Sequence, residues 1–488
     1  MDYYNILRIP LDATAEEIRS AYFAAIRAYH PDVNPSPEAR EIFIRVQEAY
    51  EVLSNPQRRA TYDANIPPEY RQPPSVALEW TLSRNAIPRL NEPQLVYVML
   101  DLKTTVFPDP VTAPPAHICL VVDRSTSMRG ERIEMVRISI GRLIQKLRPN
   151  DLVSLIAFGD KAEILLNSIP VQNQIEILHT VNQIQVGGGT EILRGLETAI
   201  NLVRFANHAN NITAQIWLIT DGHTYGDEQA SIELATNAYQ EGIVIHAFGI
   251  GKDWNDDFLD ILAGIAGGAA HLIRDEEDLS RYFEQKGLNL KQLYAKNIEI
   301  DFVSEAGIAL NYAFKVAEEA VVLPTASPLP IGDLYYSQGV KIIFEFLIPP
   351  MSIDTNNISL LQGKLLMEIP TLRVRFWRMP VSVNCEIKDE VEFTRLPDDL
   401  VKILAQLTLY RMQERARQEV TTGDISRASR RLHYLATHLM AKGKYALARS
   451  VLTESEHLQR THHMSDDRAK HIKYGTRALL LPSGTEEE

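Results

Sequence analysis

The stretch 115–290 constrains the fold most, because short apolar runs alternate there with longer segments of helical periodicity. The apolar runs are 117–123, 151–159, 215–221, 243–251 and 269–275. Strands that are apolar throughout are buried on both faces, and intervening helices make successive strands parallel. We therefore expect a doubly wound α/β domain over 115–290. The run 162–167 follows its neighbour too closely for a helical crossover, so it is predicted to be an antiparallel edge strand.

The segments on either side of this domain have β-strand patterns and weak helical periodicity. They cover residues 78–107 before it and 293–392 after it. The simplest arrangement is one antiparallel β-sandwich into which the α/β domain is inserted. Such an insertion requires only that the two insertion points lie close together.

Residues 1–66 have helical periodicity, broken by a polar loop that contains Pro31. Thr14 and Glu17 are spaced as a capping box at the start of one long helix, and Pro37 suits the first position of the next. Four prolines lie within 64–77, which predicts a stiff, extended linker at 67–77.

The C-terminal region returns to helical periodicity over 397–459, with turn residues at 422–424 and at Gly443. This pattern predicts helical hairpins. The remaining tail, 461–488, is polar and ends in three glutamates, so we expect it to be frayed. The fold class is therefore multidomain: helical domains at both ends, and an α/β domain inserted in a β-sandwich between them.

Composition excludes several function classes. The chain of 488 residues has 50 Lys and Arg against 63 Asp and Glu, a net charge of −13. Nucleic-acid binding and docking on anionic lipid both require a basic surface, so neither is expected. No secretory signal or membrane-spanning run is evident, and the two cysteines, Cys119 and Cys385, lie in strand-like apolar runs typical of inert core residues. A soluble, cytoplasmic protein is expected.

The loop between the first two long helices contains His30-Pro31-Asp32. Tyr3, Tyr4 and Leu7 at the start and the run 49–53 complete a frame that resembles the J domain of DnaJ-type co-chaperones over residues 1–66. The resemblance implies that His30, Pro31 and Asp32 contact a DnaK-type chaperone and stimulate its ATP hydrolysis.

The helix before this loop differs from the usual J-domain pattern, which is rich in lysine and arginine. Only Arg19 and Arg27 are basic between Thr14 and Tyr29, against Glu16 and Glu17. Electrostatic steering towards an acidic chaperone surface is therefore expected to be weak. A degenerate J domain that serves only as a docking element is the alternative.

Hydroxyl and carboxylate side chains follow the strands of the predicted α/β domain. Asp123, Ser125 and Ser127 end the first strand, Thr190 follows three glycines, and Asp221 ends a later strand. Ligands of doubly wound sheets bind at the carboxyl ends of the strands. A set of oxygen donors without thiol or imidazole suits a hard divalent cation, magnesium in the first place and manganese as the alternative.

These five positions resemble the metal-ion-dependent adhesion site of von Willebrand factor A domains, a resemblance that covers about 115–290. It implies that Ser125, Ser127 and Thr190 contact the cation directly. Asp123 and Asp221 would act through water or as close neighbours. An open coordination position would accept a carboxylate from a partner protein. A turn without metal, and an A domain that works without metal, are the alternatives.

Five histidines offer no comparable site: His223, His457, His462, His463 and His471 lack thiol partners and are interpreted as solvated. We find no nucleophile elbow, phosphate-binding loop or zinc-protease motif, so no catalytic residues are assigned. Two non-enzymatic functions remain. The protein is a co-chaperone that brings an acidic client to a DnaK-type ATPase, or a metal-dependent scaffold with a degenerate J domain. An AAA-type ATPase fits either function as a further partner.

Overall fold

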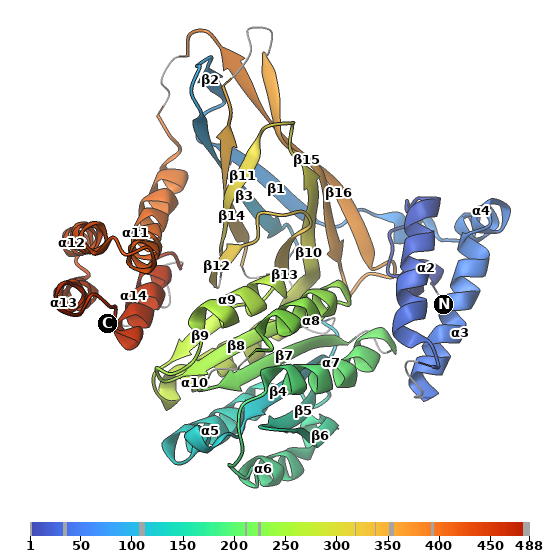
Figure 1. Cartoon of the computed structure of the whole chain (residues 1–488). Helices are drawn as coiled ribbons and strands as arrows, with labels where there is room; N and C mark the ends of the chain where they lie inside the picture. The colour runs from blue at the N-terminus through green and yellow to red at the C-terminus, as the bar shows by residue number, and fades with distance from the viewer. Residues whose placement is uncertain are drawn as a thin grey trace.

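Four structural units make up the computed structural model of the protein (Figure 1). They are an N-terminal helical domain, an α/β domain, a β-sandwich and a C-terminal group of helices. The structure describes residues 2–32, 37–106, 113–209, 212–222, 226–317, 319–336, 338–350, 356–391 and 395–481.

The α/β domain contains a six-stranded sheet in the order β6-β5-β4-β7-β8-β9. Its strands are β4 (Ala116–Asp123), β5 (Leu152–Phe158), β6 (Ala162–Pro170), β7 (Thr213–Thr220), β8 (Val244–Ile250) and β9 (Ala270–Ile273). The strands are parallel except β6, which pairs antiparallel with β5 at the edge, as predicted. Strands β4, β7 and β8 are buried along their whole length, which explains their largely apolar sequences.

Helices cover both faces of this sheet. One face packs against α5 (Glu131–Lys146), α6 (Gln174–Asn182) and α10 (Glu276–Leu290). The other packs against α7 (Ile192–Ala209), α8 (Glu228–Gln240) and α9 (Asp256–Ile265). The doubly wound arrangement is therefore confirmed.

The sandwich consists of two five-stranded sheets, ordered β1-β3-β14-β11-β12 and β13-β10-β15-β16-β2. Its strands are β1 (Val76–Leu82), β2 (Ala86–Pro88), β3 (Gln94–Thr104), β10 (Leu293–Val303), β11 (Ala309–Val316), β12 (Ala320–Leu323), β13 (Leu329–Tyr335), β14 (Val340–Ile348), β15 (Asn357–Glu368) and β16 (Phe376–Lys388). Strand β3 precedes the α/β domain and pairs with β14, which follows it, so the domain is inserted as predicted. One short strand departs from the antiparallel pattern, because β2 runs parallel to β16.

The N-terminal domain contains α1 (Tyr3–Leu7), α2 (Ala15–Tyr29), α3 (Pro37–Leu53) and α4 (Pro56–Ala64) around one apolar core. The capping box of α2 is present: the Glu17 N–H donates to Thr14 Oγ1 at 3.2 Å, and the Thr14 N–H donates to Glu17 Oε2 at 2.7 Å. The linker differs from the prediction of an extended segment. It forms the 3-10 helix η1 (Pro68–Arg71), whose first residue is a proline with φ already suited to a helical turn.

The N-terminal domain is docked on the sandwich. Arg378 of β16 donates to Asp12 Oδ2 at 2.7 Å and to Glu17 Oε1 at 2.8 Å. The Arg8 guanidinium contacts the buried Glu368 carboxylate at 3.3 Å. A cleft of about 740 Å³ remains between α2, α8 and the strand that carries Trp377.

The C-terminal helices are α11 (Asp398–Thr421), α12 (Ile425–Ala441), α13 (Tyr445–Thr461) and α14 (Asp466–Ala478). The prediction of a frayed tail over 461–488 is wrong for 466–478, because α14 packs against α9 and α11. Lys473 Nζ contacts Asp256 at 2.7 Å and Asp260 at 2.6 Å, and the Arg477 guanidinium donates to both oxygens of Asp260 at 2.8 and 2.7 Å. The buried face of α14 is thus held by charge, which apolar periodicity does not detect.

Two expectations drawn from composition can be compared with the structure. Cys119 and Cys385 are both free and buried, as expected. Burial raises the pKa of the Cys385 thiol to about 11, so that thiol is unreactive near neutral pH. Among the described residues, no helix combines the length and the apolar character that crossing a bilayer requires.

Replacing Lys473 should destabilise the fold, since its ammonium group lies among buried carboxylates. We expect Lys473→Met to lower the free energy of unfolding by about 3 kcal/mol, measured by urea denaturation at neutral pH. Pairing with Arg477 and Lys473 holds the pKa of the Asp260 carboxyl below its usual range. The stabilisation that the ionised Asp260 provides is therefore complete above the unfolded-state pKa of an aspartate, about 3.9. It is lost as the pH falls through the folded-state pKa of Asp260.

The matched control is Lys402→Met on exposed surface of α11, which should leave stability within about 0.5 kcal/mol. Equal denaturation midpoints for the two variants would show that α14 is not held by its buried charges.

Candidate functional site

Three loops meet at the carboxyl edge of the α/β sheet. The loop after β4 contains the short 3-10 helix η2 (Thr126–Met128). Its Arg124 carbonyl accepts from the Gly187 N–H at 2.6 Å, and its Thr126 N–H donates to the Gly188 carbonyl at 3.3 Å. The loop after β7 begins at Asp221 and completes the group. Main-chain hydrogen bonds thus join the loop after β4 to the third loop, which contains Gly187 and Gly188, before any side chain contributes.

The structure places all five predicted metal ligands around one point. Ser125 Oγ and Ser127 Oγ are 2.9 Å apart, and Ser127 Oγ donates to Asp221 Oδ1 at 2.8 Å. A Cβ placed on Gly222 would lie 3.4 Å from Thr190 Oγ1 and 4.0 Å from Asp123 Oδ2. The five side chains come from three loops that are far apart in the sequence. The fold of the sheet brings these loops together.

Close backbone approach explains the glycines before Thr190. A Cβ on Gly189 would lie 2.7 Å from Asp160 Oδ1, well inside van der Waals contact. That same oxygen accepts from the Gly189 N–H at 2.9 Å, which fixes the loop. Gly188 has φ of +95°, a conformation that side chains with a Cβ rarely adopt.

Asp123 and Asp221 are both buried, although each carries a carboxylate. Asp123 accepts from the Ser125 N–H at 2.8 Å and from Thr220 Oγ1 at 2.7 Å. Burial raises the pKa of the Asp123 carboxyl to about 6, and the neighbouring Asp221 carboxylate acts in the same direction. Two buried carboxylates with three hydroxyls form an all-oxygen set, and this set fits a hard divalent cation.

The His30-Pro31-Asp32 loop lies at the end of α2, which finishes at Tyr29. The side chain of His30 is 41% exposed and that of Asp32 is 89% exposed. The Asp32 N–H donates to His30 Nδ1 at 3.2 Å, and the imidazole meets the Phe43 ring edge-on. The imidazole is therefore held by its own loop and by α3 and remains accessible from solvent.

Comparison with known proteins identifies the two domains that carry these sites. A family model of the DnaJ domain matches residues 2–63, and a model of the von Willebrand factor type A domain matches residues 117–285. The chain joins a J domain to a von Willebrand factor A domain. The chaperone protein DnaJ of Dictyoglomus thermophilum is 56% identical over 62 residues, which are 13% of this chain and 16% of that protein.

Other comparisons concern the rest of the chain. A model described as the Sll0103-like C-terminal alpha-helical domain matches residues 398–482. Protein sll0103 of Synechocystis sp. is 28% identical over 257 residues, which are 52% of this chain and 59% of that protein. The chain thus spans 59% of the length of sll0103 and 16% of that DnaJ protein, less than two thirds of either relative.

Two solved structures share the fold at low sequence identity. The von Willebrand factor type A protein from Catenulispora acidiphila is 15% identical with a TM-score of 0.64, covering 83% of this chain and 97% of that one. The ArnB paralog VWA2 from Sulfolobus acidocaldarius is 16% identical with a TM-score of 0.52, covering 83% and 99%. Both comparisons therefore show a shared fold over most of the chain.

Arg132 lies beside the five predicted metal ligands of the A domain, and the sequence analysis did not identify it. It lies on the first turn of α5, and its guanidinium forms an ion pair with the buried carboxylate of Asp221. Its second terminal nitrogen is 3.7 Å from Asp253 Oδ2. A positive charge at this position compensates Asp221 without a metal ion. No motif marks it, because arginine at the start of a helix is common.

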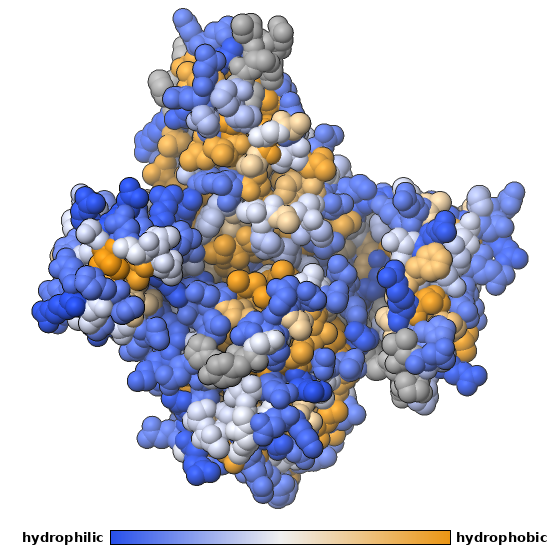
Figure 2. All heavy atoms as spheres, in the orientation of Figure 1, coloured by the Kyte–Doolittle hydropathy of each residue, from blue (hydrophilic) through white to orange (hydrophobic). Residues whose placement is uncertain are grey.

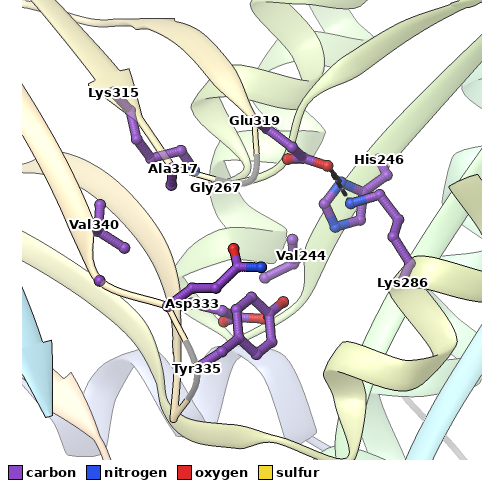
Figure 3. Close-up of a pocket in the computed structure, with 12 residues that line it drawn as sticks. Val244, His246, Gly267, Lys286, Lys315, Ala317, Glu319, Asp333, Tyr335 and Val340 are labelled. Atoms are coloured by element: carbon purple, nitrogen blue, oxygen red, sulfur yellow. Dashed lines mark hydrogen bonds and ion pairs between the residues drawn. The ribbon is translucent and has the colours of Figure 1, made fainter. Parts of the chain in front are cut away.

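A second group with metal-ligand chemistry lies between the A domain and the sandwich. His246, His271 and Glu319 place one ligand atom each within 4.8 Å of one another. Figure 3 shows Lys286 reaching the same Glu319 carboxylate, and the His246 Nδ1 accepts from the Ala269 N–H at 3.3 Å. The possible metal-ligand atoms of this group already make hydrogen bonds or ion pairs within the protein. We therefore interpret the group as a buried charge cluster that joins the two domains. The adjoining cavity, about 30 Å³, has room for about one water.

The histidines interpreted as solvated in the sequence differ in burial. His462 and His463 are exposed and His457 is half-buried. His471 is half-buried, and burial lowers its pKa. His223 lies outside the described residues. Within the described ranges, none of them belongs to a group of three ligands.

Removing Arg132 should destabilise the metal-free A domain, since Asp221 would be buried without a compensating charge. We expect Arg132→Ala to lower the free energy of unfolding in EDTA by about 1–2 kcal/mol, because the guanidinium is partly exposed and part of its contribution is screened. Chemical denaturation measures the change. The exposed Arg129→Ala is the matched control and should have no effect. An unchanged Arg132→Ala protein would contradict this role.

Proposed function

We propose that this protein is a non-enzymatic co-chaperone. Its A domain binds an acidic protein partner through a divalent cation, and its J domain recruits a DnaK-type ATPase chaperone. The observation that carries the proposal is the presence in one chain of an exposed His30-Pro31-Asp32 loop and a convergent set of five oxygen-bearing side chains. Both domains are of types that bind proteins.

Asp123, Ser125, Ser127, Thr190 and Asp221 would hold the cation, which we take to be magnesium, with manganese as the alternative. Bound there, the cation would supply an electrophilic position that accepts a carboxylate from the partner. The hydroxyls of Ser125, Ser127 and Thr190 would be the direct ligands, and Asp123 and Asp221 would act through water or as close neighbours. With neutral oxygens in direct contact, the cation would stay electrophilic towards that carboxylate. The net charge of −13 makes direct attraction of an acidic partner unfavourable, so the cation is the recognition element.

A scaffold function with a degenerate J domain is the second candidate. The observation that favours it is the environment of α2, which carries Arg19 and Arg27 as its only basic residues. One side of this helix, with Ala21, Ala25 and Ala28, also lines the cleft against the body of the protein. An AAA-type ATPase partner and a cytoplasmic location fit either candidate.

Stimulation of a DnaK-type ATPase distinguishes the two candidates. We expect the purified full-length protein to raise steady-state ATP turnover of such a chaperone severalfold, and His30→Gln to abolish the effect while leaving the fold intact. His30 is partly exposed, and among the described residues its side chain meets Asp32 of its own loop and the half-buried Phe43, so we expect the substitution to leave the core in place. His438→Gln on exposed surface of α12 is the matched control. Unchanged turnover at saturating protein would rule out the co-chaperone function and favour the scaffold.

Metal binding is tested by thermal unfolding with and without about 5 mM magnesium. A ligand that binds only the folded state stabilises it by about 2.7 kcal/mol at 100 times its Kd. We expect the wild type to shift upward, Asp123→Ala to show no shift, and Ser125→Ala to shift less than the wild type, since water can replace one hydroxyl. Arg132→Ala should show a larger shift than the wild type, because a competing positive charge is gone.

The exposed Asp467→Ala serves as the control and should respond to magnesium like the wild type. Isothermal titration calorimetry measures magnesium binding directly, first without acetate and then with excess acetate. Acetate can occupy the open coordination position of the cation. No shift, no heat and no bound metal in the wild type under these conditions would exclude a metal-dependent function.

A further inference from the structure

Arg132 lies between two carboxylates that differ in exposure. Its guanidinium forms an ion pair with Asp221, which is fully buried, and its second terminal nitrogen is 3.7 Å from Oδ2 of Asp253. The side chain of Asp253 is 61% exposed and that of Arg132 is 30% exposed. The guanidinium thus extends from the predicted metal ligands towards solvent, with one carboxylate on each side of it.

The guanidinium of Arg132 and a bound cation would compete for Asp221. In the structure Nη1 of Arg132 pairs with Oδ2 of Asp221 and donates to the Ser127 carbonyl oxygen at 3.4 Å. The other Asp221 oxygen accepts from Ser127 Oγ at 2.8 Å. Positive charges a few ångströms apart repel each other strongly where bulk water is excluded. A divalent cation held beside Asp221 would therefore displace the guanidinium.

Asp253 lies on a loop whose main chain is fixed on both sides of it. The buried ammonium group of Lys470, on α14, donates to the carbonyl oxygens of Lys252 and Trp254, the latter at 2.5 Å. The buried Trp254 indole donates to the Gly251 carbonyl at 3.1 Å. Figure 2 shows mainly hydrophilic residues on the visible face where the C-terminal helices border the α/β domain. The loop is thus held by the C-terminal helices, while the Asp253 carboxylate stays in solvent.

The same loop leaves room for the guanidinium to move towards Asp253. A Cβ on Gly251 would lie 3.3 Å from Arg132 Nη2, and the φ of +73° at this position also favours glycine. Among the described residues, the Asp253 carboxylate has no other hydrogen bond or ion pair. An N–H···O hydrogen bond is about 2.7–3.2 Å long, so a shift of about 1 Å would convert the contact with Arg132 into a direct one.

From these contacts we propose that Asp253 is a positioning residue of the metal site and acts through Arg132. The guanidinium pairs with Asp221 until a divalent cation takes that carboxylate, and it then moves to Asp253. Every charge keeps a partner in this exchange, because the cation compensates Asp221 and Asp253 receives Arg132. Asp253 therefore raises the affinity for the cation although it is not one of the five ligands. The inference rests on the function proposed above, since it requires that the A domain binds a divalent cation.

A double-mutant cycle tests the proposal with the full-length protein. Isothermal titration calorimetry measures the Kd for magnesium, with excess acetate in every titration. We expect Asp253→Asn to weaken binding about threefold, the size of effect that a partly exposed ion pair gives. Arg132→Ala should tighten binding at least about tenfold, because the competing charge is gone. In the Arg132→Ala background, Asp253→Asn should no longer change the Kd, which shows that Asp253 acts through Arg132 and not by its own field.

Glu131→Gln is the matched control, since it removes an exposed carboxylate from the same turn of α5. It should leave the Kd unchanged with and without Arg132. The proposal is overturned if Asp253→Asn binds magnesium like the wild type, or if it weakens binding equally in the presence and absence of Arg132. Magnesium binding in those cases would leave the proposed function standing. No binding by either the wild type or Arg132→Ala would overturn both.

Discussion

The pairing of β3 with β14 is the constraint on which the rest of the structure depends. It runs in unbroken register from Gln94 opposite Ile348 to Leu102 opposite Val340. The two strands lie on opposite sides of the A domain in sequence, so the sandwich core forms only when the two ends of that domain are brought together. The same pairing fixes β11 and β12, and with them Glu319, against β8 and β9. Glu319 thereby lies against His246 of β8 and His271 of β9.

Buried charge then fixes how the domains meet. Lys286 of the A domain pairs with Glu319 of the sandwich, and Lys473 and Arg477 of α14 pair with Asp256 and Asp260 of α9. Apolar contacts between domains tolerate sliding, whereas a buried ion pair is satisfied in only one relative position and is strongly destabilising when broken. The domain arrangement is therefore specific even where the contact surfaces are mixed in character.

The sequence predicted what periodicity and local motifs encode. The parallel sheet, the edge strand β6, the capping box and the grouping of Asp123 with Asp221 all depend on residues whose type is required locally. Helix α14 could not be predicted in this way, because Lys473 and Arg477 are buried through partners over two hundred residues away. Arg132 was missed for the same reason: its meaning arises only when α5 brings it to Asp221. Contacts between residues far apart in the sequence leave no local pattern, and such contacts could therefore not be predicted from the sequence.

Docking of the J domain explains why its α2 begins with acidic residues. Glu17 both completes the capping box and binds Arg378 of the sandwich, and Asp12 binds the same guanidinium. These carboxylates therefore anchor the domain to the sandwich, at the opposite end of α2 from His30. These contacts hold the J domain in a defined position relative to the A domain, so it does not swing on a linker. The His30-Pro31-Asp32 loop stays exposed in this position. Two partners bound at these sites would be held near each other by the protein itself, which raises the effective concentration of each for the other without any contact between them.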